Sequence, residues 1–217
     1  MHVLNRRPAR AFRQAFLVLL GAMSACMPGG ARRAEATAHV VAAGEGVVLD
    51  ARGGLTVDPA LAAALTDISP ARLRVTDSTL VAFGTRHTMS DTVSATRGIG
   101  AARRWIFGEL SRYAAECGGC LRVELDPAML TIARHPDKPS VNVVNVLAWL
   151  PGRDTSRVIV IGGHYDSCVC NKDRFDATSN APGADDDGSG SAAVIELARV
   201  FSRHFPHGLN APIVFAV

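Results

Sequence analysis

“RVIVIGGHYDS” (157–167) and “APGADDDGSGSAAVIELA” (181–198) are the two stretches that decide the fold expected of this chain. The first contains an apolar run, Val158–Ile161, without polar alternation, as is typical of a strand covered on both faces. The second places three consecutive aspartates before residues with the apolar spacing of a helix. Because another apolar strand is expected over 211–217, the order of strand, helix and strand predicts a parallel pair with a right-handed connection.

One histidine and four aspartates gather where this strand ends and the helix begins. His164 follows the strand, at the carboxyl end where ligands of α/β sheets bind. Side chains two residues apart in an extended segment face the same way, so Asp166 can accept a hydrogen bond from the His164 nitrogen that does not bind metal. Asp185, Asp186 and Asp187 repel one another unless a cation offsets their charge, and one carboxylate can bridge two cations about 3.5 to 4 Å apart. The pattern predicts a divalent metal site, where a carboxylate such as Asp186 can offer one oxygen to each of two cations.

The rest of the sequence predicts an α/β fold. A helix with one apolar face is expected over 97–117, capped by Thr96, and a short one over 77–83. The expected extended segments are 121–125, 141–150, 157–166 and 211–217. We therefore expect three layers, α/β/α, around a mixed, mostly parallel sheet that is truncated at the carboxyl end of the chain.

Composition and the amino terminus indicate a folded, exported protein. Of the 217 residues, 48% are hydrophobic and 20% are charged, which excludes disorder of the whole chain, and the net charge of +3 gives no reason to expect a nucleic-acid partner. Arginines precede an apolar run from Ala15 to about Ala25, the layout of a secretory signal peptide and too short to span a bilayer. Cys26 follows small residues, as at a bacterial lipoprotein processing site, so lipid anchoring and simple secretion both stay open. We expect an extracytoplasmic protein, either periplasmic, secreted or lipid-anchored to the cell envelope, which meets the membrane only through this segment.

Four further cysteines make an even set, which in an oxidising compartment favours structural disulfides. They are Cys117, Cys120, Cys168 and Cys170. A redox pair is disfavoured because no thioredoxin-like context precedes Cys117, and a zinc knuckle because the spacing of Cys168 and Cys170 is too tight. The connectivity stays open.

Taken together, “GGHYDS” (162–167) and “APGADDDGSGSAAVIELAR” (181–199) resemble the co-catalytic zinc aminopeptidase family, of the bacterial secreted leucyl aminopeptidase and aminopeptidase Y type. “FGTRHTMS” with “TRGIGAARRWI” (83–106) and “NVLAWLPG” (145–152) resemble amino-terminal segments of the same family. The likeness covers roughly residues 77–217. We therefore expect a signal peptide over 1–26, a linker or accessory segment over 27–76 and the incomplete amino-terminal part of a zinc peptidase domain over 77–217.

The resemblance implies roles for three residues of this chain. His164 would be a ligand of one zinc, Asp186 would bridge both zincs, Asp166 would orient His164, and a cis peptide would join Asp186 to Asp187. It also implies two zinc ions per complete domain, which activate a water that hydrolyses peptides with a free amino terminus.

In the family, a glutamate pair follows the strand that corresponds to 211–217, one member being the general base and the other a zinc ligand. An aspartate ligand and a histidine ligand come later. This chain carries two of the five protein ligands and no matching general-base glutamate. We therefore expect the 217-residue chain to be an inactive fragment of a metallopeptidase.

Three alternatives stay open at the level of sequence. One is a non-catalytic relative of the same fold, and another is a single-zinc enzyme similar to glutaminyl cyclase. The third is a calcium-binding loop, although Pro182 and Gly183 leave no helix to enter it. The residues that fit the calcium pattern are Asp185, Asp187, Ser189, Gly190 and Glu196.

Overall fold

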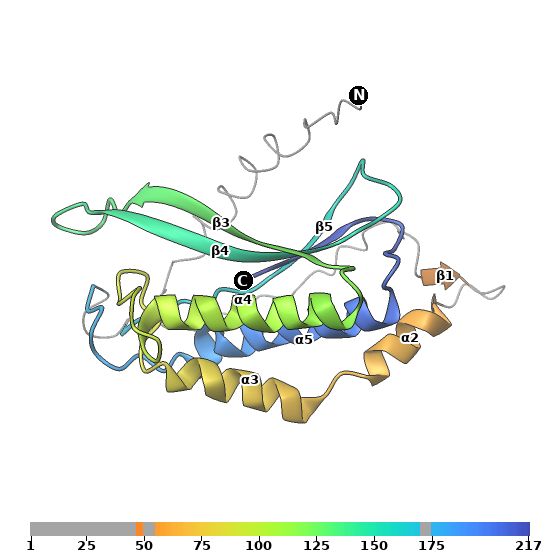
Figure 1. The fold of residues 1–217 in the computed structure, drawn as a ribbon, viewed down its shortest axis with the longest axis horizontal. Helices are drawn as coiled ribbons and strands as arrows, with labels where there is room; N and C mark the ends of the chain where they lie inside the picture. The colour runs from red at the N-terminus through yellow and green to blue at the C-terminus, as the bar shows by residue number, and fades with distance from the viewer. Residues whose placement is uncertain (1–46, 50–54, 170–174) are drawn as a thin grey trace, which may run out of the picture. The chain divides into compact units, whose positions relative to one another are not determined.

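A four-stranded sheet organises the residues that the computed structural model describes (Figure 1). The described residues are 47–49, 55–169 and 175–217, and all of them belong to the compact unit Ala42–Val217. The predicted signal peptide with Cys26, and also Cys170, lie outside them. In the sheet order β3-β4-β6-β5, the strands are β3 (Arg122–Thr131), β4 (Ser140–Leu150), β5 (Ile159–Gly162) and β6 (Ile213–Ala216). A separate antiparallel ribbon pairs β1 (Val47–Leu49) with β2 (Leu55–Val57).

The sheet is mixed, as predicted, but only its β5–β6 pairing is parallel among the described strands. The balance therefore differs from the mostly parallel sheet that we expected. Residues 132–139 join β3 to β4, and so short a connection produces an antiparallel hairpin. A whole helix lies between β5 and β6, which is the connection that a parallel pair needs. β3 also runs past the predicted 121–125 and includes Pro127, which an edge strand tolerates.

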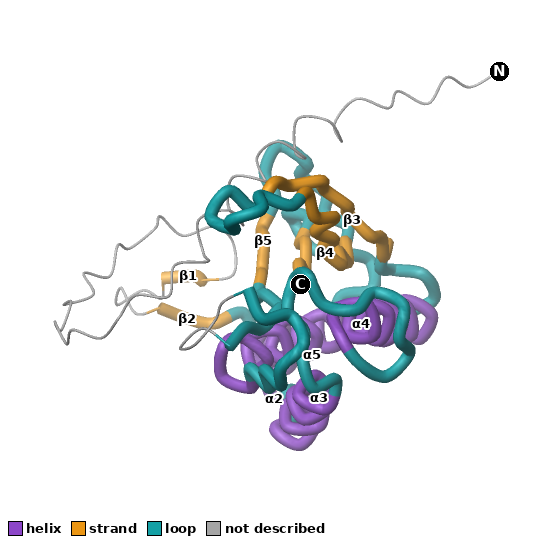
Figure 2. Tube along the Cα trace, turned by 90° about the vertical axis from the view of Figure 1, so that its left-hand side faces the viewer, coloured by secondary structure: helices purple, strands orange, loops and turns teal. Residues whose placement is uncertain are grey.

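All helices near the sheet lie on one of its faces, as Figures 1 and 2 both show. They are α2 (Pro59–Thr66), α3 (Pro70–Ala82), α4 (Gly98–Glu116) and α5 (Ser189–His204). The described residues thus supply two of the three expected layers. β5 was expected to be covered on both faces, yet Ile159 and Val160 are 50% and 39% exposed because this strand is the edge of the described sheet. Within the described ranges, no helix combines the length and apolar character that crossing a bilayer requires.

The helix expected over 77–83 is only the end of α3, which begins at Pro70, and α2 precedes it. Asp58 accepts a hydrogen bond from the Ala60 amide at 2.7 Å, and Ser69 accepts one from the Arg72 amide at 3.3 Å. Each cap is followed directly by a proline, a strong helix-start signal that the weak apolar periodicity of this region concealed. Helix α4 begins at Gly98 without a side-chain cap, so the predicted Thr96 cap is wrong.

The core lies between the sheet and helices α4 and α5, which run side by side beneath it (Figure 1). Its buried side chains come from every layer of the described unit. From α4 they include Ile99, Ala102, Ile106, Leu110 and Tyr113, from α5 Val194, Ile195, Ala198 and Val200, and from the strands Val146, Ala148, Leu150, Ile213 and Phe215. The apolar face predicted for 97–117 is confirmed, and it holds α5 against the sheet.

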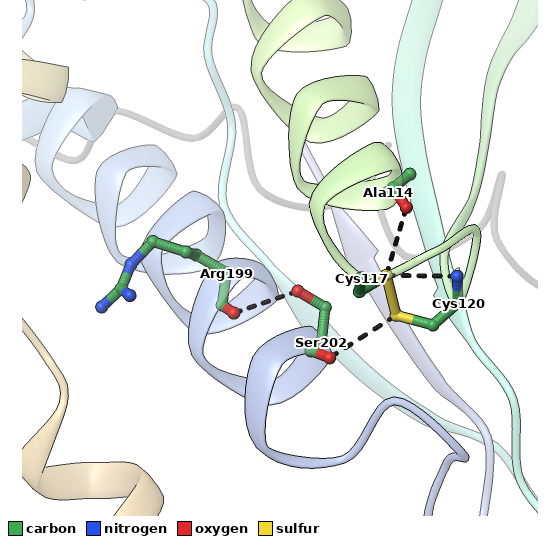
Figure 3. The surroundings of a disulfide bond; sticks show 5 residues. All are labelled: Ala114, Cys117, Cys120, Arg199 and Ser202. Carbon is green, nitrogen blue, oxygen red and sulfur yellow. Dashed lines mark hydrogen bonds between the residues drawn. A yellow bond between two sulfur atoms is a disulfide. The ribbon is translucent and has the colours of Figure 1, made fainter.

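A disulfide joins Cys117 to Cys120 where α4 ends and the chain turns toward β3 (Figure 3). The Cys120 sulfur lies 3.6 Å from the Ser202 carbonyl oxygen of α5, and the Cys120 amide donates to the Cys117 sulfur at 3.1 Å. Cys168 is also disulfide-bonded. The expected disulfide bonding is thus present at Cys117, Cys120 and Cys168, and the short Cys117–Cys120 link holds the α4–β3 turn beside α5.

A buried ion pair on α5 attaches the α2–α3 turn to the rest of the unit. Glu196 is 3% exposed and accepts hydrogen bonds from the Ser69 amide at 2.9 Å and from Arg199 Nη2 at 2.7 Å. Arg199 is 6% exposed and also donates to the Asp67 carbonyl oxygen at 2.6 Å. This network fixes the middle of α5 against the α2–α3 turn.

We predict that Glu196→Met destabilises the chain by about 3 kcal/mol, because the substitution removes the buried carboxylate closest to the Arg199 guanidinium and leaves it only the partly exposed carboxylate of Asp67 at 3.3 Å. Chemical denaturation of the metal-free chain measures this loss. The double variant E196M/R199M should recover most of it, since no unpaired charge then remains buried. Arg112→Ala is the matched control, because its pairs with Glu109 and Glu116 are exposed and worth less than about 1 kcal/mol. Equal losses in E196M and R112A would contradict the prediction.

Candidate metal centre

His164 stands at the point where the chain leaves the sheet. β5 ends at Gly162, and the Gly163 amide still donates to the Ala216 carbonyl oxygen at 3.1 Å, so the pairing with β6 stops just before His164. The next amide, that of His164, donates to Asp187 Oδ2 at 3.1 Å instead of to a strand. The backbone of His164 is therefore held by the acidic turn that precedes α5.

The imidazole of His164 lies between two carboxylates. Its Nδ1 is 3.1 Å from Asp166 Oδ1, and its Nε2 is 3.1 Å from Asp186 Oδ1. Because an ionised carboxylate only accepts hydrogen bonds, Nδ1–H donates to Asp166, and Nε2 is the nitrogen left to face Asp186. His164 and Asp186, which lie more than twenty residues apart in the sequence, are thus brought together. Together with Asp166, the imidazole has the arrangement that a metal-binding histidine and its orienting carboxylate adopt.

The environment shifts the pKa values of both members of the His164–Asp166 pair. The hydrogen bond to Asp166 raises the pKa of the His164 imidazole to about 9, against the opposing effect of desolvation. Desolvation favours the neutral form of Asp166, but hydrogen bonds from His164 and from Thr88 hold its pKa below the ordinary value. In the metal-free chain the pair is an imidazolium with a carboxylate at neutral pH.

The acidic triplet lies in a tight turn, η1 (Ala184–Gly188), between the loop after β5 and helix α5. A cis peptide joins Asp186 to Asp187, as the family resemblance implied. Gly183 precedes the turn with a φ of +49°, a left-handed conformation that favours glycine. The side chain of Asp186 is 70% exposed, and its Oδ1 faces the His164 ring. The side chains of Asp185 and Asp187 do not pair with Nε2 of this ring.

Asp187 ties the two halves of the site together through its carboxylate. Its Oδ2 accepts the His164 amide at 3.1 Å, and its Oδ1 accepts the Gly190 amide in the first turn of α5 at 3.0 Å. The bond from the Gly190 amide places the Asp187 carboxylate at the amino-terminal end of α5, where the helix dipole favours a negative charge. A Cβ atom on Gly190 would lie 2.2 Å from Asp187 Oδ1, so only glycine leaves room for the carboxylate.

His164 and Asp186 fit a zinc ion as two members of a larger ligand set. Two donors that bind a tetrahedral zinc at about 2.0 to 2.1 Å lie about 3.3 Å from each other, close to the 3.1 Å between Nε2 and Oδ1. Within the described ranges, no three His, Cys, Asp or Glu side chains gather closely enough to hold a metal. Two donors alone do not complete a zinc site, and the described residues place no general-base glutamate beside them.

Two contributions to the site were not foreseen from the sequence. Thr88 Oγ1 donates to Asp166 Oδ2 at 2.9 Å, so that both oxygens of this carboxylate are engaged. Asp187 was expected to serve the turn, but not to bind the backbone of His164. The only available signal for Thr88 was its place in “FGTRHTMS” (83–90), a stretch without chemical character of its own.

The calcium-loop alternative is wrong. Residues from Ser189 onward form helix α5 instead of a loop. Glu196, the twelfth position of that pattern, is buried and paired with Arg199. Asp187 is occupied by two backbone amides, so the pattern's ligands do not converge.

Comparison with known proteins places this geometry in a family. The sequence pattern of “Peptidase family M28” matches residues 145–217, which span β4 to β6 and include His164, Asp166 and the acidic triplet. A “Probable zinc metalloprotease” of Pyricularia oryzae is 46% identical over 159 residues, which is 73% of this chain and 30% of that protein. “Leucine aminopeptidase 1” of Grosmannia clavigera is 30% identical over 146 residues, which is 67% of this chain and 31% of that protein.

A solved structure shares the fold. The crystal structure of LapB from Legionella pneumophila matches with a TM-score of 0.53 and 25% identity, over 74% of this chain and 37% of that one. This chain thus spans about a third of the length of the curated relatives that it matches. The family pattern, these relatives and the shared fold agree, and the chain belongs to peptidase family M28.

Proposed function

We propose that this chain contributes part of the active site of a zinc aminopeptidase, which removes amino-terminal residues from peptides by means of a water activated by two zinc ions. The approach of His164 Nε2 to Asp186 Oδ1, with Asp166 on the opposite ring nitrogen, is the observation that carries the proposal. The names of the relatives support the metal and the reaction, since one is called a zinc metalloprotease and another a leucine aminopeptidase.

His164 and Asp186 would hold the metal, and each of their neighbours has a separate task. When bound, zinc acts as a Lewis acid and lowers the pKa of a coordinated water toward about 7. Asp166 keeps the proton of His164 on Nδ1, so that Nε2 presents its lone pair to the metal. Asp187 fixes the distance between the end of β5 and the turn that carries Asp186.

We predict that His164→Gln and Asp186→Asn each abolish most of the zinc affinity of the chain, because each removes one of two donors. Asp166→Asn should weaken zinc binding about 10- to 100-fold, as is usual for residues that orient a ligand. Competition with a chromophoric chelator measures these dissociation constants. His207→Gln is the control, since His207 is exposed and lies outside the site. Unchanged affinity in both H164Q and D186N would rule out the site.

Zinc affinity should also depend on pH in a defined direction. With a pKa of about 9 in the metal-free chain, the His164 imidazole carries a proton at pH 7 that zinc must displace. The affinity should therefore rise about tenfold per pH unit from 7 toward 9 and then level off. The stability of the metal-free chain changes in the opposite direction. The raised pKa of His164 stabilises the folded chain fully below about pH 6.5, and this stabilisation is lost as the pH rises through about 9.

Chelator competition at a series of pH values tests the first trend, and denaturation without metal tests the second. In Asp166→Asn the main cause of the raised pKa is gone, so both transitions should move toward pH 6.5. A zinc affinity that stays flat between pH 7 and 9 would contradict the proposed role of His164.

We propose further that the 217-residue chain by itself does not release amino acids. The described residues place two donors and no general base at the site, whereas two-metal hydrolysis needs a fuller ligand set and a proton acceptor. Incubation of the zinc-loaded chain with aminoacyl p-nitroanilides, with and without chelator, measures this. Chelator-sensitive release that disappears in H164Q would overturn the prediction.

A further inference from the structure

The segment Gly84–Ser90, part of “FGTRHTMS” in the sequence, has no place in the site described so far. It lies between α3 and α4 in the chain, yet its side chains reach the two loops that carry His164 and Asp186. Arg86 is the largest fully buried side chain among the described residues, with 0% exposure. A buried guanidinium that spans two ligand-bearing loops calls for a physical explanation.

Arg86 binds backbone carbonyl oxygens from three separate segments. Its Nε donates to the Tyr165 carbonyl oxygen at 2.6 Å, and Nη1 donates to that of Leu80 at 2.9 Å. Nη1 also donates to the Pro182 carbonyl oxygen at 2.8 Å, and Nη2 donates to that of Gly183 at 2.9 Å. One rigid guanidinium thus joins the end of α3 to the loop after β5 and to the entrance of the acidic turn.

Two of the carbonyls that Arg86 binds lie close to the predicted ligands in the sequence. Tyr165 stands between His164 and Asp166 in the sequence, and Gly183 is the residue from which the turn with Asp186 departs. The distance between the Tyr165 and Gly183 carbonyls is fixed by Arg86, and this distance helps to set how closely the two ligands approach.

Backbone hydrogen bonds and the side chain of Ser167 also join this segment to the same two loops. The Arg86 amide donates to Ser167 Oγ at 3.0 Å, and the Ser167 amide donates to the Arg86 carbonyl oxygen at 3.2 Å. Ser167 Oγ in turn donates to the Ala181 carbonyl oxygen at 2.7 Å, and the Ala181 amide donates to that of Gly84 at 2.8 Å. The segment therefore forms a bridge between the two loops, and Arg86 is its central side chain.

Charge also favours a guanidinium at this position. Burial holds the pKa of Arg86 below its ordinary value, while the carboxylates of Asp166, Asp77 and Asp187 act in the opposite direction. An arginine remains protonated even so. Its charge offsets the repulsion among these carboxylates, one of which orients His164 and another of which holds the His164 backbone.

Thr88 completes the bridge on the side of His164. Its hydroxyl donates to Asp166 Oδ2, the oxygen that His164 does not use. This bond fixes the plane of the carboxylate and through it the rotation of the imidazole ring. Arg86 acts on the backbones of the ligands, and Thr88 acts on one of their side chains.

We propose that Arg86 and Thr88 are positioning residues of the metal site, which hold His164 and Asp186 at the separation that zinc requires. The inference rests on the proposed zinc-binding function. Arginine is suited to this task because its planar fork offers five donors, whereas a lysine offers a compact ammonium with three. Neither residue touches the metal or a substrate.

The experiment compares Arg86→Met, Thr88→Val and Arg199→Met in the 217-residue chain. Arg199 is the matched control because it too is a buried arginine, 6% exposed, and lies eleven residues along α5 from Gly188, about 16 Å at 1.5 Å per residue. Zinc affinity is measured by chelator competition and stability by denaturation without metal. NMR of the metal-free chain follows the His164 Nδ1–H resonance, which reports the bond to Asp166 directly.

We expect R86M to weaken zinc binding about 10- to 100-fold and T88V to weaken it several-fold, as residues behind metal ligands commonly do. Both should shift or broaden the His164 Nδ1–H resonance. R199M should lower stability and leave zinc affinity and this resonance unchanged. Because T88V removes one hydroxyl and keeps the side-chain shape, it decides the question if R86M does not fold.

The proposal is overturned if both R86M and T88V fold and bind zinc as tightly as the unaltered chain. If R86M does not fold, unchanged zinc affinity in T88V alone overturns it. It is also overturned if R199M weakens zinc binding as much as they do, because a general loss of stability then explains the effect. Failure of the proposed function looks different, since the unaltered chain would then bind zinc no better than H164Q. In that case the resonance decides the inference, which stands if R86M and T88V move it while R199M does not.

Discussion

The approach of an imidazole to a carboxylate across two loops is the constraint on which the rest of this structure depends. His164 Nε2 and Asp186 Oδ1 lie 3.1 Å apart, although one follows a strand and the other precedes a helix. Nothing in either loop enforces this distance by itself. Asp187 supplies one link by binding the amides of His164 and Gly190, and Arg86 supplies another by binding the carbonyls beside each ligand. The site is held by backbone contacts as much as by side chains.

The polar groups around the site form one connected set, and this has an energetic reason. Buried charges are costly unless they are paired, and here the buried guanidinium of Arg86 faces several carboxylates, of which Asp166 and Asp187 each bind further donors. Thr88 and His164 extend the set on the side of Asp166. A second buried pair, Glu196 with Arg199, performs a similar task farther along α5, where it secures the helix to the α2–α3 turn. The helix α5 thus begins directly after the turn that holds Asp186, and the Glu196–Arg199 pair lies farther along it.

Membership of peptidase family M28 indicates why these contacts matter for the chemistry of the chain. The chain matches only part of the length of its relatives. Its sheet is covered by helices on one face within the described residues (Figure 2), and those residues bring together two candidate metal donors. Both observations agree with a chain that spans about a third of the length of its curated relatives. What it does contain is the structural framework of the His164–Asp186 pair.

The sequence by itself determined the elements and the pair. Apolar runs of two different periods marked β4, β5, β6, α4 and α5, and the order “GGHYDS” then “ADDDGSG” located His164, Asp166 and Asp186, because local spacing specifies local structure. Tertiary structure alone decided the balance of antiparallel and parallel strands and the roles of Arg86 and Thr88. Those roles depend on hydrogen bonds between residues about 80 to 100 positions apart, such as Thr88 with Asp166 and Arg86 with Gly183. No periodicity along the chain encodes contacts of that kind, since they exist only once the loops have been brought together.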